Sequence, residues 1–335
     1  MGARRQPMSA RRALAIAVLV LGLAPGTFVR TPVPEKRADG VEVRRAGDLP
    51  PLMQLAGFER VGVWELASPN IDFGGFSALV YLDGRQRLRA FSDRGIRMTM
   101  ALPDGPQAGE AQFNAVWERG RLSPTAPDIE AAVRDPASGT YWIASEGTNA
   151  VWRYSAASRL EALRQPLEWS RWPENAGPEA MAQLPDGRFL VLPEGHATGV
   201  IHPGDPTVEA PARRFAVTVP EAYSATDLAA LPDGRVLVLL RHVVAAYPPF
   251  TAALGIANPA ELDNGDVLMV RLLLDLDSMV PRENYEGMAL QPLDDGRMAA
   301  WIIADDNLAS FQRTLLVKLA FDPAQMSPTR IGTRP

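Results

Sequence analysis

The sequence predicts an all-β fold, a single β-propeller, from three observations: a recurring hairpin, a period of about 50 residues, and strands that are apolar on both faces. Five copies of the hairpin align on Ser77, Glu130, Glu179, Asp227 and Glu286, at intervals of 53, 49, 48 and 59 residues. A propeller blade of four short strands needs a repeat of this length. The chain is therefore expected to form a ring of blades around a central channel.

The turn of each hairpin is marked by an Asp-Gly or Ser-Gly pair, whose residues tolerate the positive φ that tight hairpins require. The pairs are Asp83-Gly84, Ser138-Gly139, Asp186-Gly187, Asp233-Gly234 and Asp295-Gly296. The flanking runs, such as "RFLVLP", "RVLVLL" and "AAWIIA", are apolar at successive positions. A strand has this composition when its sheet is covered on both faces, as in stacked blades.

Outer strands are expected from further apolar runs at Asn149–Ser155, Asp266–Leu274 and Thr314–Phe321. The run Phe58–Ala67 precedes the first hairpin and can complete the last blade, whose own sequence ends after its third strand. Closure of the ring by strands from both termini leaves no exposed sheet edge. This arrangement predicts five four-stranded blades.

A ring of six blades is the alternative to five. It requires a degenerate blade within Ile96–Ala126 or within Val243–Asp263. Neither segment contains a copy of the hairpin motif.

The N-terminus is typical of a secretory signal peptide. Basic residues precede the apolar run Ala13–Ala24, and Pro25 ends it. Twelve apolar residues are short for a membrane span, although an uncleaved anchor is the alternative. We expect a signal peptide at 1–24, a flexible lead-in at 25–54, the propeller at 55–321 and a tail at 322–335. The mature protein is then periplasmic or secreted, exported by either the general or the twin-arginine route, with no membrane span.

Composition excludes several classes of function. The formal net charge of −5 gives no basic surface for nucleic acid, which we do not expect as a partner. The chain has no cysteine, so disulfides, thiol chemistry and thiolate metal sites are excluded. No Gly-rich phosphate loop opens a helix. We expect a monomer stabilised by its buried core.

Carboxylates recur at both outer ends of the hairpins. Because antiparallel pairing places the start of the first strand beside the end of the second, these residues should meet at one mouth of the channel. The first strands supply Glu130, Glu179, Asp227 and Glu286, with Ser77 in the first copy. The second strands supply Asp93, Glu146, Glu194, Arg241 and either Asp305 or Asp306. Asp128 is a further candidate.

Crowded carboxylates repel one another unless protons, arginines or a cation compensate them. A hard divalent cation with oxygen ligands, calcium first, is the simplest compensation. Arg94 and Arg241 are the local positive partners. The alternative is that the acids only accept hydrogen bonds from strand-end amides and arginines, as an inherited structural feature of the repeat.

Several segments of the hairpin copies carry a resemblance to a known family: "GGFSALVY", "FSDRG", "PDIEAA", "YWIASEG", "GPEAMAQLPDGR", "NYEGMAL" and "WIIADDN". Together they resemble the phytase-like β-propeller family, which is often labelled "esterase-like activity of phytase". The resemblance covers about residues 55–321. It implies an exported bacterial propeller that hydrolyses phosphate esters or esters. It also maps the family's motif acids onto Asp93, Glu130, Glu146, Glu179, Glu194, Asp227, Glu286, Asp305 and Asp306, as ligands of calcium in the channel mouth.

Other chemistries are less well supported by the sequence. The chain has no G-x-S-x-G element, and its three histidines, His196, His202 and His242, lack a zinc-binding spacing. His196 or His242 could act as a general base near the mouth, or be an ordinary loop histidine. Trp169 and Trp172 could rim the mouth or pack in the core.

We therefore expect a calcium-dependent hydrolase of a small anionic or ester substrate. Glu179 and Glu286 are the expected catalytic carboxylates, with Arg94 and Arg241 gripping an anionic group. The chain has only two lysines, Lys36 and Lys318, which is few for binding the further phosphates of phytate, so phytate itself is not the expected substrate. The alternatives are a non-catalytic envelope protein that binds a ligand or partner at the same mouth, and a sugar-lactone hydrolase.

Overall fold

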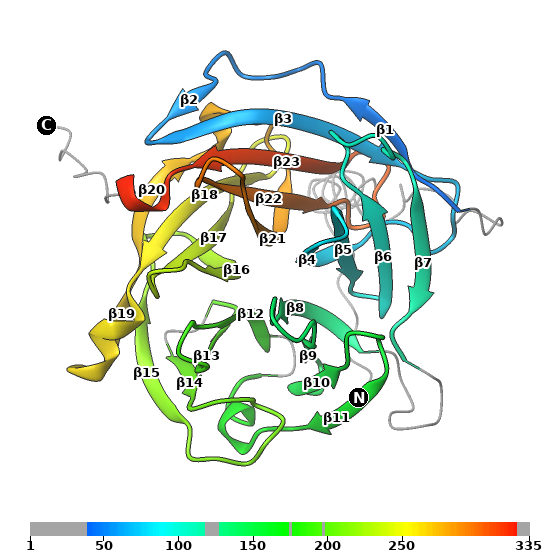
Figure 1. Ribbon diagram of the computed structural model, residues 1–335. Helices are drawn as coiled ribbons and strands as arrows, with labels where there is room; N and C mark the ends of the chain where they lie inside the picture. Colours follow the sequence, from blue (N-terminus) through cyan, green and yellow to red (C-terminus); the bar gives the residue numbers. More distant parts are fainter. Residues whose placement is uncertain (1–38, 118–126, 174–175, 196–197, 327–335) are drawn as a thin grey trace, which may run out of the picture.

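Five small β-sheets stand in a ring around a central channel, as Figure 1 shows. The computed structural model describes residues 39–117, 127–173, 176–195 and 198–326. The expected signal peptide and C-terminal end lie outside these residues. The predicted five-bladed propeller is confirmed, and we number the blades from the first hairpin.

The first and second blades are four-stranded antiparallel sheets in simple sequence order. The segment Ile96–Ala126, considered above for a sixth blade, contains the two outer strands of the first blade, so a sixth blade there is wrong. The strands are β4 (Phe76–Leu82), β5 (Arg87–Ser92), β6 (Ile96–Ala101) and β7 (Ala111–Ala115), then β8 (Asp128–Arg134), β9 (Tyr141–Glu146), β10 (Ala150–Tyr154) and β11 (Leu160–Arg164).

The third blade receives its outermost strand from the segment of chain that forms the fourth blade. The run expected as one strand at Asp266–Leu274 is two: β19 pairs in parallel with β15 of the third blade, while β20 completes the fourth. The third blade is β12 (Pro178–Gln183), β13 (Phe189–Pro193), β14 (Thr198–His202), β15 (Arg213–Thr218) and β19 (Val267–Met269). The fourth is β16 (Ser224–Ala230), β17 (Val236–Val243), β18 (Phe250–Ala257) and β20 (Arg271–Asp275). Since β18 lies in the second segment considered for a sixth blade, that reading is wrong as well.

The fifth blade joins the two ends of the chain. β3 pairs antiparallel with β23, as predicted, and β1 continues the sheet outward. β1 lies inside the segment 25–54 that was expected to be a flexible lead-in, so this part of the lead-in is a strand of the fifth blade. The strands are β21 (Asn284–Pro292), β22 (Met298–Asp305), β23 (Thr314–Phe321), β3 (Phe58–Ala67), β1 (Glu42–Arg45) and β2 (Gln54–Leu55).

The inner strands β4, β8, β12, β16 and β21 contact one another in order around the channel. The glycine of each predicted turn has positive φ, between 71° and 89°, as a tight hairpin requires. Because each turn joins the first two, antiparallel strands of its blade, the turns lie at one mouth of the channel, and the carboxylate-bearing strand ends lie at the other.

Apolar side chains fill the interfaces between blades in five clusters, one for each neighbouring pair. Trp169 and Trp172 are buried between the second and third blades, with ring centroids 5.6 Å apart, so they pack in the core and do not rim a mouth. Three short 3₁₀ helices contribute a buried residue to this filling, η1 (Leu167–Trp169), η2 (Pro259–Asp263) and η3 (Leu276–Ser278), whereas a fourth, η4 (Pro323–Gln325), has none.

Candidate metal and hydrolase site

A β-bulge occurs at the same place in the first strand of every hairpin. The strand register skips one residue in each blade, and these residues are Ser77, Glu130, Glu179, Thr226 and Glu286. A bulge leaves its extra residue out of the ladder and re-aims the side chain. Three of the five bulges carry a glutamate, which explains why carboxylates recur beside apolar strands.

The fourth blade departs from the predicted alignment. Thr226 holds the bulge position, so the equivalence of Asp227 with Glu179 is wrong. Asp227 is fully buried, and its carboxyl oxygens accept hydrogen bonds from the amides of Leu228 at 2.7 Å and Met288 at 2.6 Å. Burial raises the pKa of Asp227 well above its ordinary value. This residue links the fourth blade to the fifth and is not part of the mouth.

The alternative between Asp305 and Asp306 is resolved by the register. The residue before each bulge pairs with the residue before Asp93, Glu146, Glu194, Arg241 or Asp305. Asp306 instead accepts hydrogen bonds from the amides of Gly75 at 3.0 Å and Leu308 at 3.1 Å, and from the Thr314 hydroxyl at 3.1 Å. Asp306 thus ties the fifth blade to the first, and its predicted role as a metal ligand is not supported by these contacts.

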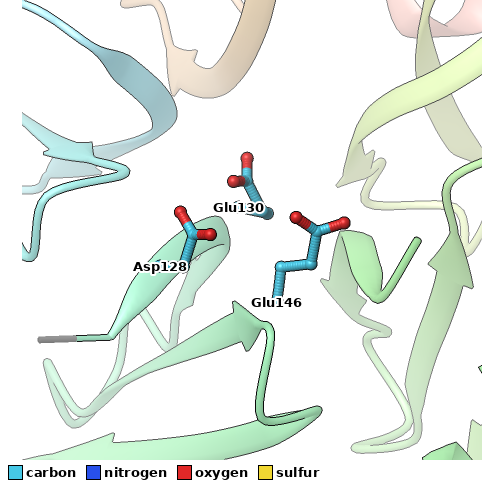
Figure 2. A group of neighbouring side chains, drawn as sticks. All are labelled: Asp128, Glu130 and Glu146. Atoms are coloured by element: carbon cyan, nitrogen blue, oxygen red, sulfur yellow. The ribbon is translucent and has the colours of Figure 1, made fainter. Parts of the chain in front are cut away.

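Two triads of carboxylates meet at the mouth and share Glu146. Within each triad, one oxygen of every residue lies within 4.8 Å of the others. Figure 2 shows the first triad, Asp128, Glu130 and Glu146, with the three carboxylates turned toward a common space. The second triad is Glu146, Glu179 and Glu194, and it spans the second and third blades.

Gly177 allows the third blade to approach Glu146 closely. Its amide donates a hydrogen bond to Glu146 Oε1 at 3.3 Å. A Cβ at this position would lie 2.5 Å from Asn149 Oδ1 and 3.2 Å from Glu146. The glycine that opens the "GPEAM" motif therefore allows the third blade to pack closely against Glu146, the residue that the two triads share.

Arg241 is surrounded by carboxylates. Its guanidinium donates hydrogen bonds to Glu194 Oε1 at 3.0 Å, to Asn284 Oδ1 at 3.1 Å and to Glu286 Oε1. Asn284 also donates to Glu286 at 2.8 Å, so it orients both partners. Burial lowers the pKa of Arg241, but Glu286, Glu179 and the neighbouring glutamates outweigh it and raise this pKa overall. The sequence reasoning missed Asn284, although it stands directly before "YEGM" in the last copy of the hairpin.

Arg94 contacts the backbone of the segment that precedes the first blade. Its guanidinium donates to the backbone carbonyls of Ile71 at 3.2 Å, Phe73 at 3.0 Å and Gly74 at 3.2 Å. Nε of Arg94 lies 4.0 Å from Asp93 Oδ1. Arg94 therefore anchors the segment that enters the first blade, and these contacts do not support its predicted grip on a substrate.

Asp93 carries an oxygen without a hydrogen-bond partner. Its Oδ1 is buried and accepts no hydrogen bond from any described residue. Burial raises the pKa of Asp93 to about 6 against the opposing effect of Arg94, and repulsion by Asp128 and Glu286 adds to the increase. An orphaned carboxylate oxygen of this kind indicates a position where a proton or cation is needed.

Burial and mutual repulsion raise the pKa of the mouth carboxyls. Burial is the larger cause for Glu130, Glu179 and Asp305, whose pKa values lie well above the ordinary range, and Glu286 contributes repulsion to each. The pKa of Glu286 itself is raised by burial, although Arg241 opposes this. A cluster of oxygen ligands with this excess of negative charge fits a hard divalent cation such as calcium.

The described histidines offer no evident general base at the mouth. His202 is buried, accepts a hydrogen bond from Trp169 Nε1 at 3.0 Å, and has a pKa lowered to about 4 by burial. The ring of His242 packs 5.6 Å from that of Tyr223. His196 lies outside the described residues.

Residues 71–308 match the Phytase-like family, described as esterase-like activity of phytase. The chain belongs to this family. The matched range runs from just before the first hairpin to the end of the last, so it contains every acid of the mouth. The resemblance noted in the sequence is thereby confirmed.

No curated protein matches the chain by sequence. Among solved structures, a luciferin-regenerating enzyme is similar over 86% of this chain and 94% of its own, at 11% identity and a TM-score of 0.43. The Dos1 propeller is similar over 72% of each chain, at 11% identity and a TM-score of 0.38.

Proposed function

We propose that this phytase-like propeller is a metal-dependent hydrolase of phosphate esters or carboxylic esters, with calcium as its metal and a small anionic ester as substrate. The observation that carries the proposal is the pair of carboxylate triads sharing Glu146 at one mouth of the channel. Propellers of this family are typically metal-dependent, which agrees with a donor set made of oxygen atoms.

The residues that would hold the metal are Asp128, Glu130 and Glu146 in the first triad and Glu146, Glu179 and Glu194 in the second. When bound there, a divalent cation supplies Lewis acidity toward an ester oxygen. The chain's own residues supply position and proton control around it.

Arg241 is the residue best placed to orient an anionic substrate. Glu194, Glu286 and Asn284 fix its guanidinium, so little conformational freedom is lost when an anionic group binds. Glu286 is thus a positioning residue. Glu179 belongs to the second triad, and burial and the neighbouring glutamates raise the pKa of its carboxyl, so its negative charge is costly until a cation is bound there.

We further propose that the protein acts in the periplasm or after secretion, as a monomer. The basic N-terminal segment and its apolar run, residues 13–24, support export, and they lie outside the described residues. In the part of the chain that the structure describes, no helix is long and apolar enough to cross a bilayer.

The test is a panel of phosphate, carboxylic ester and lactone substrates, assayed on the purified chain with calcium and with excess chelator. We expect hydrolysis that chelation abolishes and calcium restores. Glu146→Gln should lower kcat/KM by about 100-fold or more, since even residues that only support a metal ligand are worth 10–100-fold. Asp186→Asn, at the opposite mouth, is the matched control and should retain activity.

Hydrolysis that persists undiminished in excess chelator would refute the metal-dependent mechanism. If calcium raises the melting temperature but no substrate of the panel is cleaved, the mouth is a binding site without catalysis.

A further inference from the structure

The interface between the first and second blades differs from the other four. Toward the fifth blade, the outer strands of the first blade contribute Met98, Met100 and Ala111 to an apolar cluster. Toward the second blade, β6 and β7 contribute no residue to the apolar cluster, and β5 contributes Phe91. On this side of the first blade, the apolar contribution of its outer part comes from Val116 and Trp117, which follow β7, and not from the strands β6 and β7 themselves.

Arginines stand where apolar side chains would be expected. Side chains alternate between the two faces of a strand, so Arg87 and Arg89 share the face of Phe91, which packs toward Tyr141 of the second blade. On β6, Arg97 pairs opposite Phe91 and shares that face. The sheet face thus changes from apolar near the channel to strongly basic near the periphery.

A cavity of about 880 Å³ lies against this basic face. We call it the arginine cavity, and its basic lining residues are Arg85, Arg87, Arg89 and Arg97. The lining also includes polar side chains from β6 and β7 and two acids, namely Thr99, Gln112, Asn114, Asp39 and Glu110. Its volume is within the range of sites that hold small organic ligands.

Neutral groups satisfy much of the hydrogen bonding of these arginines. Arg89 donates to Thr99 Oγ1 and Ser158 Oγ, each at 3.1 Å, and its guanidinium lies 5.2 Å from the ring centroid of Tyr141. Arg97 donates to the Tyr141 hydroxyl at 3.5 Å. These contacts fix the positions of the side chains without neutralising their charge.

Carboxylates compensate the cavity only in part. Arg87 pairs with Glu110 at 2.8 Å, whereas Arg85, Arg89 and Arg97 have no carboxylate partner among the described residues. Burial lowers the pKa of Arg89, and repulsion by Arg97 lowers it further. Four positive and two negative side chains line the cavity of a chain whose formal net charge is −5. This concentration of positive charge calls for an anionic ligand.

We propose that the arginine cavity binds a small molecule that bears phosphate groups, at a site separate from the acidic mouth. Guanidinium groups match phosphate geometry with two parallel hydrogen bonds, and a tetrahedral oxyanion can accept from several of them at once. Hydroxyl and amide side chains beside them, such as Thr99 and Gln112, supply further donors. The site does not depend on the hydrolase proposal.

The experiment is calorimetric titration of inorganic pyrophosphate into the full chain, depleted of metal on a chelating resin and kept at low salt. We expect saturable 1:1 binding that weakens as sodium chloride is raised. Arg85→Gln and Arg97→Gln should each weaken binding about tenfold, the value of one charge-assisted hydrogen bond. Arg85 is exposed, so its replacement leaves the fold intact.

Two controls locate the site. Arg271→Gln removes an arginine from the outer strand of another blade and should bind as the parent does. Glu179→Gln alters the acidic mouth and should also leave pyrophosphate binding unchanged, even where it abolishes hydrolysis. Absence of saturable binding, equal affinity in the Arg85 and Arg97 variants, or tighter binding of citrate than of pyrophosphate would overturn the proposal.

Discussion

Replacement of Arg241 by glutamine tests whether this side chain compensates the charge of the mouth. The guanidinium contacts Glu286, Glu194 and Asn284, and its side chain is 16% exposed. In Arg241→Gln the carboxylates keep their burial and lose their cation. The variant should therefore be destabilised in a way that depends on how many of those carboxyls are ionised.

The magnitude follows from the exposure of the two partners. The Glu286 side chain is 13% exposed, and removal of one member of a buried ion pair costs about 3–5 kcal/mol. Glu194 is 36% exposed, so its contact is worth about 0.5–1 kcal/mol after solvent screening. Because Glu286 can escape part of the penalty by binding a proton, we take the lower end of its range, about 3 kcal/mol. With the Glu194 contact added, the expected loss in the free energy of unfolding at pH 8 is about 4 kcal/mol.

Thermal and denaturant unfolding of the metal-free protein measure this loss. At pH 8 the melting temperature should fall by about 10 °C, and at pH 5 by less, because burial raises the pKa of Glu286 and a bound proton removes the charge that the variant leaves unpaired. Arg188→Gln is the matched control: Arg188 also has two carboxylate partners, Asp186 at 2.7 Å and Asp263 at 2.9 Å, but both of these partners are exposed. It should cost about 1 kcal/mol or less at both pH values. An Arg241→Gln loss as small as that of the control, or equal at pH 5 and pH 8, would refute the reasoning.

Three further predictions concern the carboxylates and their supports. Burial raises the pKa of Glu130 and Asp93, so the folded state binds more protons than the unfolded state, and the stability of the metal-free protein should fall as the pH rises. For Asp93 alone, this fall occurs between pH 3.8, its ordinary pKa, and its folded-state pKa of about 6. Calcium should abolish that fall in a pH series of melting curves. Asp227→Asn should lower the free energy of unfolding by about 1–3 kcal/mol, because the amide of either Met288 or Leu228 loses its carboxylate acceptor. The loss should be the same with and without calcium, which melting curves of variant and parent under both conditions check. Gly75→Ala should cost about 1–2 kcal/mol in denaturant unfolding, since φ is +69° and the added Cβ would lie 2.6 Å from Asp93 Oδ1.

The blade architecture could be predicted because its determinants are local. The Asp-Gly turns and the apolar runs beside them fix each inner hairpin, and the predicted strands Phe58–Ala67 and Thr314–Phe321 coincide with β3 and β23. The division of 266–274 into β19 and β20 could not be read in the same way. It depends on pairing with β15 of another blade and on the Val270 amide, which donates to the Thr218 carbonyl at 2.8 Å. Such contacts leave no trace in the periodicity of one segment.

The site was predicted only where an acid lies at a repeated position. Alignment on the residue before a small apolar step placed Asp227 in the ring, whereas alignment on the turns, with Gly187 and Gly234 47 residues apart, places Thr226 opposite Glu179. The bulges decide between the two, and a bulge is an insertion that sequence alone does not display. The carbonyls that bind Arg94 were equally hidden, since backbone acceptors have no residue signature.

The fourth blade gives the mouth its polarity. Where the second and third blades present Glu146 and Glu194, the fourth presents Arg241 at the equivalent position, and Thr226 replaces a glutamate at the bulge. A ring with acids in all five blades would surround a bound anion with like charge. With one arginine fixed across the channel from the first triad, an anionic group can be held between a cation bound by that triad and the guanidinium. The departure from the repeat is thus the feature that makes an acidic mouth compatible with the anionic ester substrate that we propose.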